Sequence, residues 1–186
     1  MAVKDIVTTP NEILNKKTQK VGNIDDEIVN IAKDLIDTVK VAEEPEGAGL
    51  AATQIGVSKR MCVVRNFFED PLNPNEVKSH DIILINPKIT HYSTEKEIDW
   101  EGCLSVPDVY GLVERAEKIK VTAKDLEGNI LKIKAEGFFA RTIQHEVDHL
   151  DGILFTSKIE GDTVLTQKQF DEMLEKNKDN DVYENN

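Results

Sequence analysis

The chain has 186 residues, which is enough to bury a hydrophobic core, and its length fits a single domain. Its 39% hydrophobic and 31% charged residues are typical of an ordinary soluble globular protein. A net charge of −12 argues against direct binding to DNA, because neutralising phosphates needs clustered lysines and arginines. There is no apolar run of membrane-spanning length, no signal-peptide pattern, and only two cysteines. We therefore expect a cytoplasmic protein without membrane attachment.

Hydrophobic periodicity predicts both helices and strands. Apolar residues at helical spacing mark the helices, and Asn23 or Asp25 is placed to cap the first one. Apolar β-branched or alternating runs mark strands, and stretches rich in Pro, Asn, Gly and Glu mark loops. The expected elements in chain order are a helix over 25–40, a loop over 43–49, a strand over 60–65, a loop over 66–80, a strand over 81–86, a hairpin over 119–135, and helices over 137–150 and 166–178.

Strands dominate the middle of this order and helices lie toward its ends, so the predicted fold class is α+β. We expect mixed or antiparallel β-sheets packed around the helix over 137–150. No repeat or domain boundary is visible, so residues 1–178 are predicted to form one domain. The tail over 179–186 is polar, and we expect it to be disordered.

The strongest functional signal is QHEVDHL at 144–150, within the last predicted helix before the C-terminal region. His145 and His149 are four residues apart and share one helix face, so both imidazoles can bind one metal ion. Glu146 follows the first histidine and can act as general base toward a water molecule there. A chance match is the alternative, but buried His and Glu side chains are costly unless they are paired or bind a metal.

Such a catalytic site needs a third protein ligand, and the sequence offers more than one. A metzincin-like histidine six residues after His149 is excluded, because Phe155 occupies that position. A thermolysin-like site would take Glu172 or Glu175 from the C-terminal helix.

Cys103, in the segment EGCLS, is the better candidate for this ligand. Gly102 before it and a proline shortly after it indicate a tight segment where the backbone can approach a ligand. A buried structural cysteine or a Cys–His nucleophile would also fit this pattern. His80 and His91 have the context of surface histidines, and Cys62 that of a core residue.

A glycine-containing segment over 47–54, GAGLAATQ, is the third signal. It lacks the third glycine of a dinucleotide loop and the lysine of a phosphate-binding loop. It is either a plain turn or a backbone edge that contacts a peptide, with Gln54 as an amide donor behind it.

These three segments, GAGLAATQ, EGCLS and QHEVDHL, together resemble the signature motifs of the peptide deformylase family, in order and at suitable separations. The resemblance covers nearly the whole chain, from the region of Pro10 to about Phe155. It implies an α+β enzyme that removes the formyl group from the N-terminal methionine of nascent polypeptides and releases formate. A thermolysin-like metallopeptidase and a non-catalytic peptide-binding homologue are the alternatives.

The resemblance also implies a role for each matched residue. The metal ligands would be Cys103, His145 and His149, and Glu146 would be the general acid and base. Gln54 and the backbone N–H of Leu104 would stabilise the oxyanion, Gly49 would contact the substrate backbone, and Glu101 would orient a ligand. The residues expected around the substrate side chain are Ala48, Tyr110, Phe138, Arg141 and Thr142.

The implied cofactor is one divalent metal ion per chain, with ferrous iron expected and zinc, nickel or cobalt able to replace it. The implied partners are N-formyl-methionyl nascent peptides, and we expect a monomer. Some family members dock on the ribosome through a basic C-terminal helix. The region after residue 170 is acidic here, and like charge repels RNA, which argues against such docking.

Overall fold

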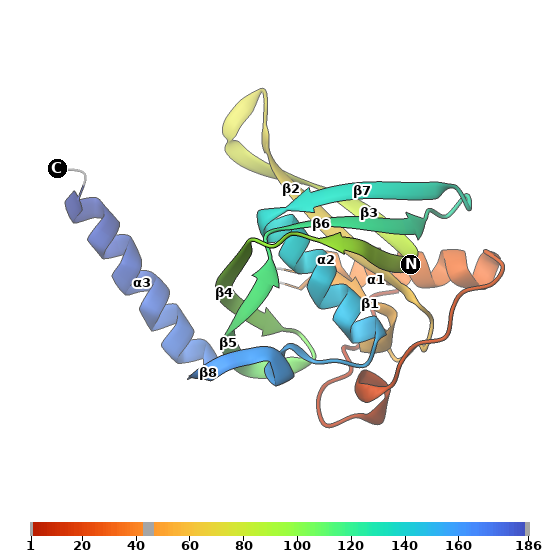
Figure 1. Cartoon of the computed structure of the whole chain (residues 1–186), viewed down its shortest axis with the longest axis horizontal. Coiled ribbons are helices and arrows are strands. Elements are labelled where there is room, and N and C mark those ends of the chain that lie inside the picture. The colour runs from red at the N-terminus through yellow and green to blue at the C-terminus, as the bar shows by residue number, and fades with distance from the viewer. Residues whose placement is uncertain (1, 43–46, 185–186) are drawn as a thin grey trace.

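The computed structural model describes residues 2–42 and 47–184, and its strands form two antiparallel sheets (Figure 1). The larger sheet has the order β1 (Gly49–Ala51), β2 (Met61–Asp70), β3 (Asn73–Tyr92), β6 (Lys118–Lys124) and β7 (Ile130–Glu136). The smaller sheet has the order β4 (Lys96–Cys103), β5 (Val106–Ala116) and β8 (Ile159–Leu165). The helices are α1 (Asp26–Lys40), α2 (Gly137–Leu150) and α3 (Gln167–Glu184), with short 3-10 turns η1 (Glu12–Asn15), η2 (Ala52–Ile55) and η3 (Phe155–Lys158). The predicted α+β class is confirmed.

The larger sheet carries a helix on each face. On β2, Met61 and Val63 pack against the apolar stripe of α1, which Asp25 caps as predicted. Their neighbours Cys62 and Val64 point to the other face, into the cluster around α2. Because both faces of the strand are covered, its sequence is a continuous apolar run rather than an alternating one.

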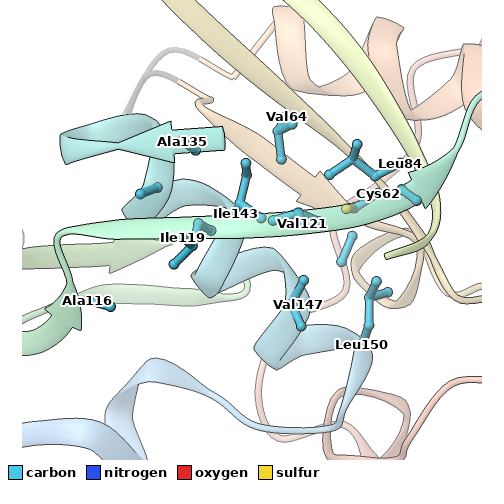
Figure 2. Packing of buried hydrophobic residues seen from close by; sticks show 13 residues of the cluster. Cys62, Val64, Leu84, Ala116, Ile119, Val121, Ala135, Ile143, Val147 and Leu150 are labelled. Atoms are coloured by element: carbon cyan, nitrogen blue, oxygen red, sulfur yellow. The ribbon is translucent and has the colours of Figure 1, made fainter. Parts of the chain in front are cut away.

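Helix α2 lies between the two sheets, in contact with β1, β2 and β7 of the larger sheet and β5 of the smaller one. Ile143, Val147 and Leu150 recur at helical spacing and pack against Leu84 and Val121 (Figure 2). Burying one side chain of this size contributes about 1.5–3 kcal/mol. This apolar contact fixes the helix against the larger sheet and leaves its other side turned toward β4.

The predicted loop over 66–80 is wrong. Strands β2 and β3 form one long hairpin that stays paired as far as Glu69 and Val77, and it projects from the body of the molecule (Figure 1). Only Pro71 and Leu72 lie between the two strands. The prolines and asparagines in this stretch lie at and beside the tight turn, and backbone pairing from Asn66–His80 to Glu69–Val77 continues the two strands up to it. Of the predicted loop over 43–49, residues 43–46 lie outside the described residues.

The C-terminal region also differs from expectation. The predicted helix over 166–178 is present, but α3 continues through Glu184, where the sequence predicts disorder from Asp179 onward. Polar contacts one turn apart, such as Gln167 Nε2 to Asp171 Oδ1 at 2.9 Å, support a helix that has little apolar surface. Across the described residues, no helix combines the length and apolar character needed to cross a membrane.

Candidate active site

Three side chains that can bind a metal meet where α2 approaches the end of β4. His145 and His149 lie one turn apart on α2, with their ring centroids 4.9 Å apart. Cys103 is the last residue of β4, and its Sγ lies 3.2 Å from Nε2 of His149. The ligand atoms of the three residues lie within 4.8 Å of one another. One sulfur and two imidazole nitrogens suit a tetrahedral transition-metal site with one position left open.

The competing ligands suggested by the sequence lie elsewhere. Glu172 and Glu175 are exposed on α3, and His80 and His91 are exposed on β3. Cys62 is fully buried in the core, as predicted. Among residues 2–42 and 47–184, the Cys-His-His cluster is the only group of three such side chains that comes together. The thermolysin-like alternative therefore loses its ligand.

Glu101 is buried two residues before Cys103 and orients one of the histidines. Its Oε2 lies 3.0 Å from Nδ1 of His145, which leaves Nε2 as the nitrogen available to a metal. Arg115 donates to both carboxylate oxygens and Arg141 donates to Oε1, each at 2.9 Å. Burial alone would raise the pKa of Glu101, but the hydrogen bonds and charges of Arg115 and His145 hold its pKa well below the usual range, so the carboxylate stays charged.

The two arginines around Glu101 are themselves held in place. Arg115 also pairs with Asp148 on α2, and Arg141 donates to the backbone oxygen of Val113 at 2.9 Å. Both arginines are almost fully buried and their guanidinium groups are paired. Arg141, which the sequence suggests as a pocket residue, therefore offers the substrate its aliphatic stem rather than a free charge. Sequence reasoning missed Arg115, because its partners are far away along the chain.

Glu146 is buried beside the cluster, and its Oε2 has no hydrogen-bond partner within the part of the chain that the structure describes. Burial raises the pKa of this carboxyl to about 7. A carboxyl that titrates near neutral pH can both take and return a proton. Gly49 lies directly against it, since a methyl group on Gly49 would be 2.6 Å from Oε1 of Glu146.

Gln54 presents its amide to the same place. Its Oε1 accepts a hydrogen bond from the backbone N–H of Ala51 at 2.8 Å, which fixes the orientation of the amide. Its Nε2 therefore points toward Sγ of Cys103, 3.6 Å away. Leu104, whose backbone N–H the family resemblance implies as a second donor, follows this cysteine directly.

The N-terminal segment ties these two donor segments together. The backbone N–H of Val7 donates to the oxygen of Gln54 at 2.8 Å, and the N–H of Thr9 donates to the oxygen of Ser105 at 2.9 Å. The segment thus crosses from η2 to the turn after β4, and it supports both sides of the site from behind.

A cavity of about 230 Å³ opens next to the cluster. All the residues that the sequence suggested around the substrate line this cavity: Ala48, Gly49, Tyr110, Phe138, Arg141 and Thr142. Trp100, Gly102 and Phe170 line it as well, and sequence reasoning missed them. Strand alternation gives a signal for the first two, because residues on either side of Glu101 must face away from it.

The site combines a buried carboxyl with a near-neutral pKa, a Cys-His-His cluster and an oriented amide. This combination is typical of a metal-dependent hydrolase. Residues 3–164 match the family model described as polypeptide deformylase. The chain therefore belongs to the peptide deformylase family, and it is an enzyme that removes the N-formyl group from nascent peptides.

Individual relatives agree with this assignment. Peptide deformylase 1 of Bacillus cereus is 45% identical over 159 residues, which cover 86% of this chain and 94% of the relative. The peptide deformylase of Dictyoglomus thermophilum is 43% identical over 167 residues, covering 90% of this chain and 99% of the relative. A crystal structure of a class I type b peptide deformylase from Acinetobacter baumannii, bound to Met-Ala-Ser, superposes with a TM-score of 0.74 at 35% identity, covering 85% of this chain and 99% of the other. A Synechococcus elongatus peptide deformylase in complex with actinonin gives a TM-score of 0.75 at 36% identity, covering 86% of this chain and 82% of the other.

Proposed function

We propose that this chain performs deformylation with a single divalent metal held by Cys103, His145 and His149, and that Glu146 is the general acid and base. The observation that carries the proposal is the convergence of these ligand atoms within 4.8 Å, beside a buried carboxyl oxygen that lacks a partner among the described residues. A purely structural site would need neither that carboxyl nor an open coordination position. A non-catalytic homologue is therefore disfavoured.

The donor set fits several metals. One thiolate and two imidazoles suit iron, zinc, nickel and cobalt, so the metal bound in a cell depends on supply as well as affinity. We propose ferrous iron as the resident metal, in keeping with the family resemblance, and the others as substitutes. When bound, the metal supplies positive charge that polarises the formyl carbonyl and makes water more acidic.

The residues of the chain then divide the reaction between them. Glu146 takes a proton from a water molecule as the oxygen of that water attacks the formyl carbon. Gln54 Nε2 and the backbone N–H of Leu104 donate to the former carbonyl oxygen as it becomes negative. Glu146 returns the proton to the leaving amine nitrogen as the C–N bond breaks, so formate and a free methionyl amine result. Glu101 holds His145 in one orientation throughout.

The substrate is proposed to be an N-formyl-methionyl nascent peptide that lies in extended form along the Gly47–Gly49 edge. The cavity beside the cluster supports this, because its lining by Phe138, Thr142 and the stem of Arg141 offers apolar surface for a methionine side chain. The Acinetobacter baumannii relative, which was solved with Met-Ala-Ser, is consistent with such a substrate.

We also propose that residues 1–178 form one catalytic domain, and that the protein acts as a cytoplasmic monomer that does not bind DNA. The net charge of −12 supports the absence of nucleic-acid binding. The acidic residues of α3 make direct docking on ribosomal RNA unfavourable, for the same reason. Analytical ultracentrifugation tests whether the protein is a monomer, and co-sedimentation with ribosomes tests whether it docks on them.

Formate release from formyl-Met-Ala-Ser, with metal content measured on the same samples, tests the mechanism. Glu146→Ala should keep its metal and lose about 10²–10⁴-fold in turnover, the usual worth of general acid–base catalysis. Gln54→Ala should lose about 10²–10³-fold, mainly in kcat, as for one oxyanion donor. Glu136→Ala, which removes an exposed carboxylate next to the first residue of α2, is the matched control and should change neither property. Near-normal turnover by fully metallated Glu146→Ala protein would refute the assigned role.

A further inference from the structure

Three aromatic side chains form a compact group at one side of the cavity, and one of them comes from α3. The ring of Phe170 stacks on the ring of Tyr110, with centroids 4.2 Å apart and an interplanar angle of 6°. It also meets the ring of Trp100 edge-on, with centroids 5.7 Å apart. All three residues line the cavity next to the metal ligands. We call Trp100, Tyr110 and Phe170 the aromatic wall.

The first turn of α3 is anchored, so the position of Phe170 is defined. Leu165, at the end of β8, pairs with Tyr110 on β5. Oδ1 of Asp108 accepts a hydrogen bond from the backbone N–H of Gln167 at 2.8 Å. The hydroxyl of Tyr110 donates to Oε1 of Gln167 at 2.6 Å. These contacts hold the start of the helix against β5, one turn before Phe170.

The aromatic wall lies on the opposite side of β4 from the ligand-orienting network. Glu101 points toward α2, where it meets His145, so its neighbours Trp100 and Gly102 face the other way. Gly102 leaves the space that Tyr110 fills, because a methyl group on Gly102 would lie 2.6 Å from a ring carbon of Tyr110. The cavity therefore has two distinct apolar sides, one from α2 and one from the aromatic wall.

The distance from the metal ligands indicates which part of a substrate meets this wall. Trp100 lies three strand residues before Cys103, which is about 10 Å at roughly 3.3 Å per residue. An extended peptide rises by the same amount per residue. A peptide with its formyl carbon at the cluster, running along the cavity from Cys103 toward Trp100, would place its second and third residues beside Trp100, rather than its methionine.

We propose that Phe170 is a specificity-determining residue, which completes an aromatic wall that binds apolar side chains at the second and third residues of the formyl peptide. The proposal rests on the deformylase mechanism given above. It concerns a residue outside positions 3–164, the part of the chain that matches the family model. The C-terminal helix thus adds to this chain a substrate contact that the matched region does not contain.

Kinetics on two formyl peptides, with full-length protein, test the proposal. We compare kcat/KM for formyl-Met-Leu-Phe with kcat/KM for formyl-Met-Ala-Ser. The ratio of the two should fall about tenfold in Phe170→Ala, mainly because KM for formyl-Met-Leu-Phe rises. A tenfold change is the low end of the range for an apolar contact in a pocket. Phe170→Leu should retain part of the ratio. Leu174→Ala removes a partly exposed apolar side chain one turn further along α3, away from the cavity lining, and should leave the ratio unchanged.

Fluorescence gives a second readout that does not depend on turnover. Trp100 is the only tryptophan of the chain and belongs to the wall, so its emission reports directly on occupancy. In zinc-loaded protein, Met-Leu-Phe should change this emission and bind about tenfold more weakly to Phe170→Ala, whereas Met-Ala-Ser should bind both proteins alike.

The possible outcomes distinguish failure of the role proposed for Phe170 from failure of the deformylase mechanism. An unchanged ratio in a folded, metallated Phe170→Ala protein would overturn the proposal while leaving the deformylase mechanism intact. A change in preference at the methionine position alone would overturn it too, since the wall would then bind methionine. If the wild-type protein releases no formate from either peptide, the mechanism itself fails, and the proposal fails with it.

Discussion

Replacing Glu101 by alanine should destabilise the protein and weaken metal binding at once. The carboxylate accepts three hydrogen bonds from two buried arginines and contacts His145, with all four distances between 2.9 and 3.0 Å. Charge-assisted hydrogen bonds contribute about 1.5–3 kcal/mol each, but desolvating the ions offsets much of the sum. Removing one partner from such a buried network leaves Arg115 and Arg141 undercompensated, so we expect a loss of about 3–5 kcal/mol.

Urea unfolding of the wild type and Glu101→Ala, with metal content measured in parallel, gives the magnitude. Glu114→Ala is the matched control, because it breaks an exposed pair with Lys96 that solvent screens and that should contribute little to stability. Losing the orienting partner of His145 should also weaken metal binding by roughly 10–100-fold. If Glu101→Ala is no less stable than Glu114→Ala, the carboxylate does not compensate the two buried guanidinium groups as argued.

The pH dependence of this stability difference is a further check. The folded protein holds the pKa of Glu101 well below its usual range, whereas the unfolded chain titrates near about 4.3. The contribution of Glu101 is therefore fully present above that pH and is lost as the pH falls toward the folded value. The gap between wild type and variant should narrow on acidification. A gap that widens below pH 4 would contradict the sign.

Three other predictions concern the site. Cys103→Ala should lose both metal and activity, while Glu172→Ala and Glu175→Ala lose neither; full metal content in the cysteine variant would end its assignment as a ligand. Gly49→Ala places a methyl group 2.6 Å from Oε1 of Glu146, so turnover should drop by about 10²-fold with metal retained. Gly22→Ala, where a methyl group meets nothing within 4 Å, should be neutral in the same formate assay. Burial raises the pKa of Glu146 to about 7, and the base must be ionised to act, so kcat/KM should rise with pH along an acidic limb centred near about pH 7. A bound metal cation favours the carboxylate and should move this limb to lower pH. An acidic limb centred above about pH 8 would argue against this base.

The sequence predicts those parts of the fold in which apolar residues recur at the spacing of a single helix or strand face. Helix α1 and the β6–β7 hairpin each bury one face, and α2 carries an apolar stripe toward the larger sheet, so their apolar residues recur at a regular interval. Strands β4 and β8 are not predicted from the sequence, because about half of the residues in each are exposed and fewer than half are apolar. They are held in place by pairing with β5. The long β2–β3 hairpin was missed because prolines near a turn were taken to exclude strands on both sides of it.

The site shows the same division. The histidines of α2 and the adjacent Glu146 could be found from spacing alone, because one helix positions them all. The tight segment around Cys103 favours this cysteine over the glutamates of α3, but a buried structural cysteine fits the same pattern, so its role as a ligand is implied only by the family resemblance. Arg115 and Phe170 could not be found in either way. Their partners are brought to them by the β4–β5–β8 sheet, and only the folded chain shows that placement.

The short N-terminal segment described above bears on how this protein can be handled as a tool. The backbone N–H of Val7 donates to Gln54, which carries one proposed oxyanion donor, and the N–H of Thr9 donates to Ser105, the neighbour of Leu104, which carries the other. We therefore expect a fusion partner joined at the N-terminus to disturb the hydrogen bonds that hold these two donor segments in place. Helix α3 leads the other end of the chain away from the sheets (Figure 1), and one residue adds about 1.5 Å of separation. Affinity tags, fluorophores and surface tethers belong at that end.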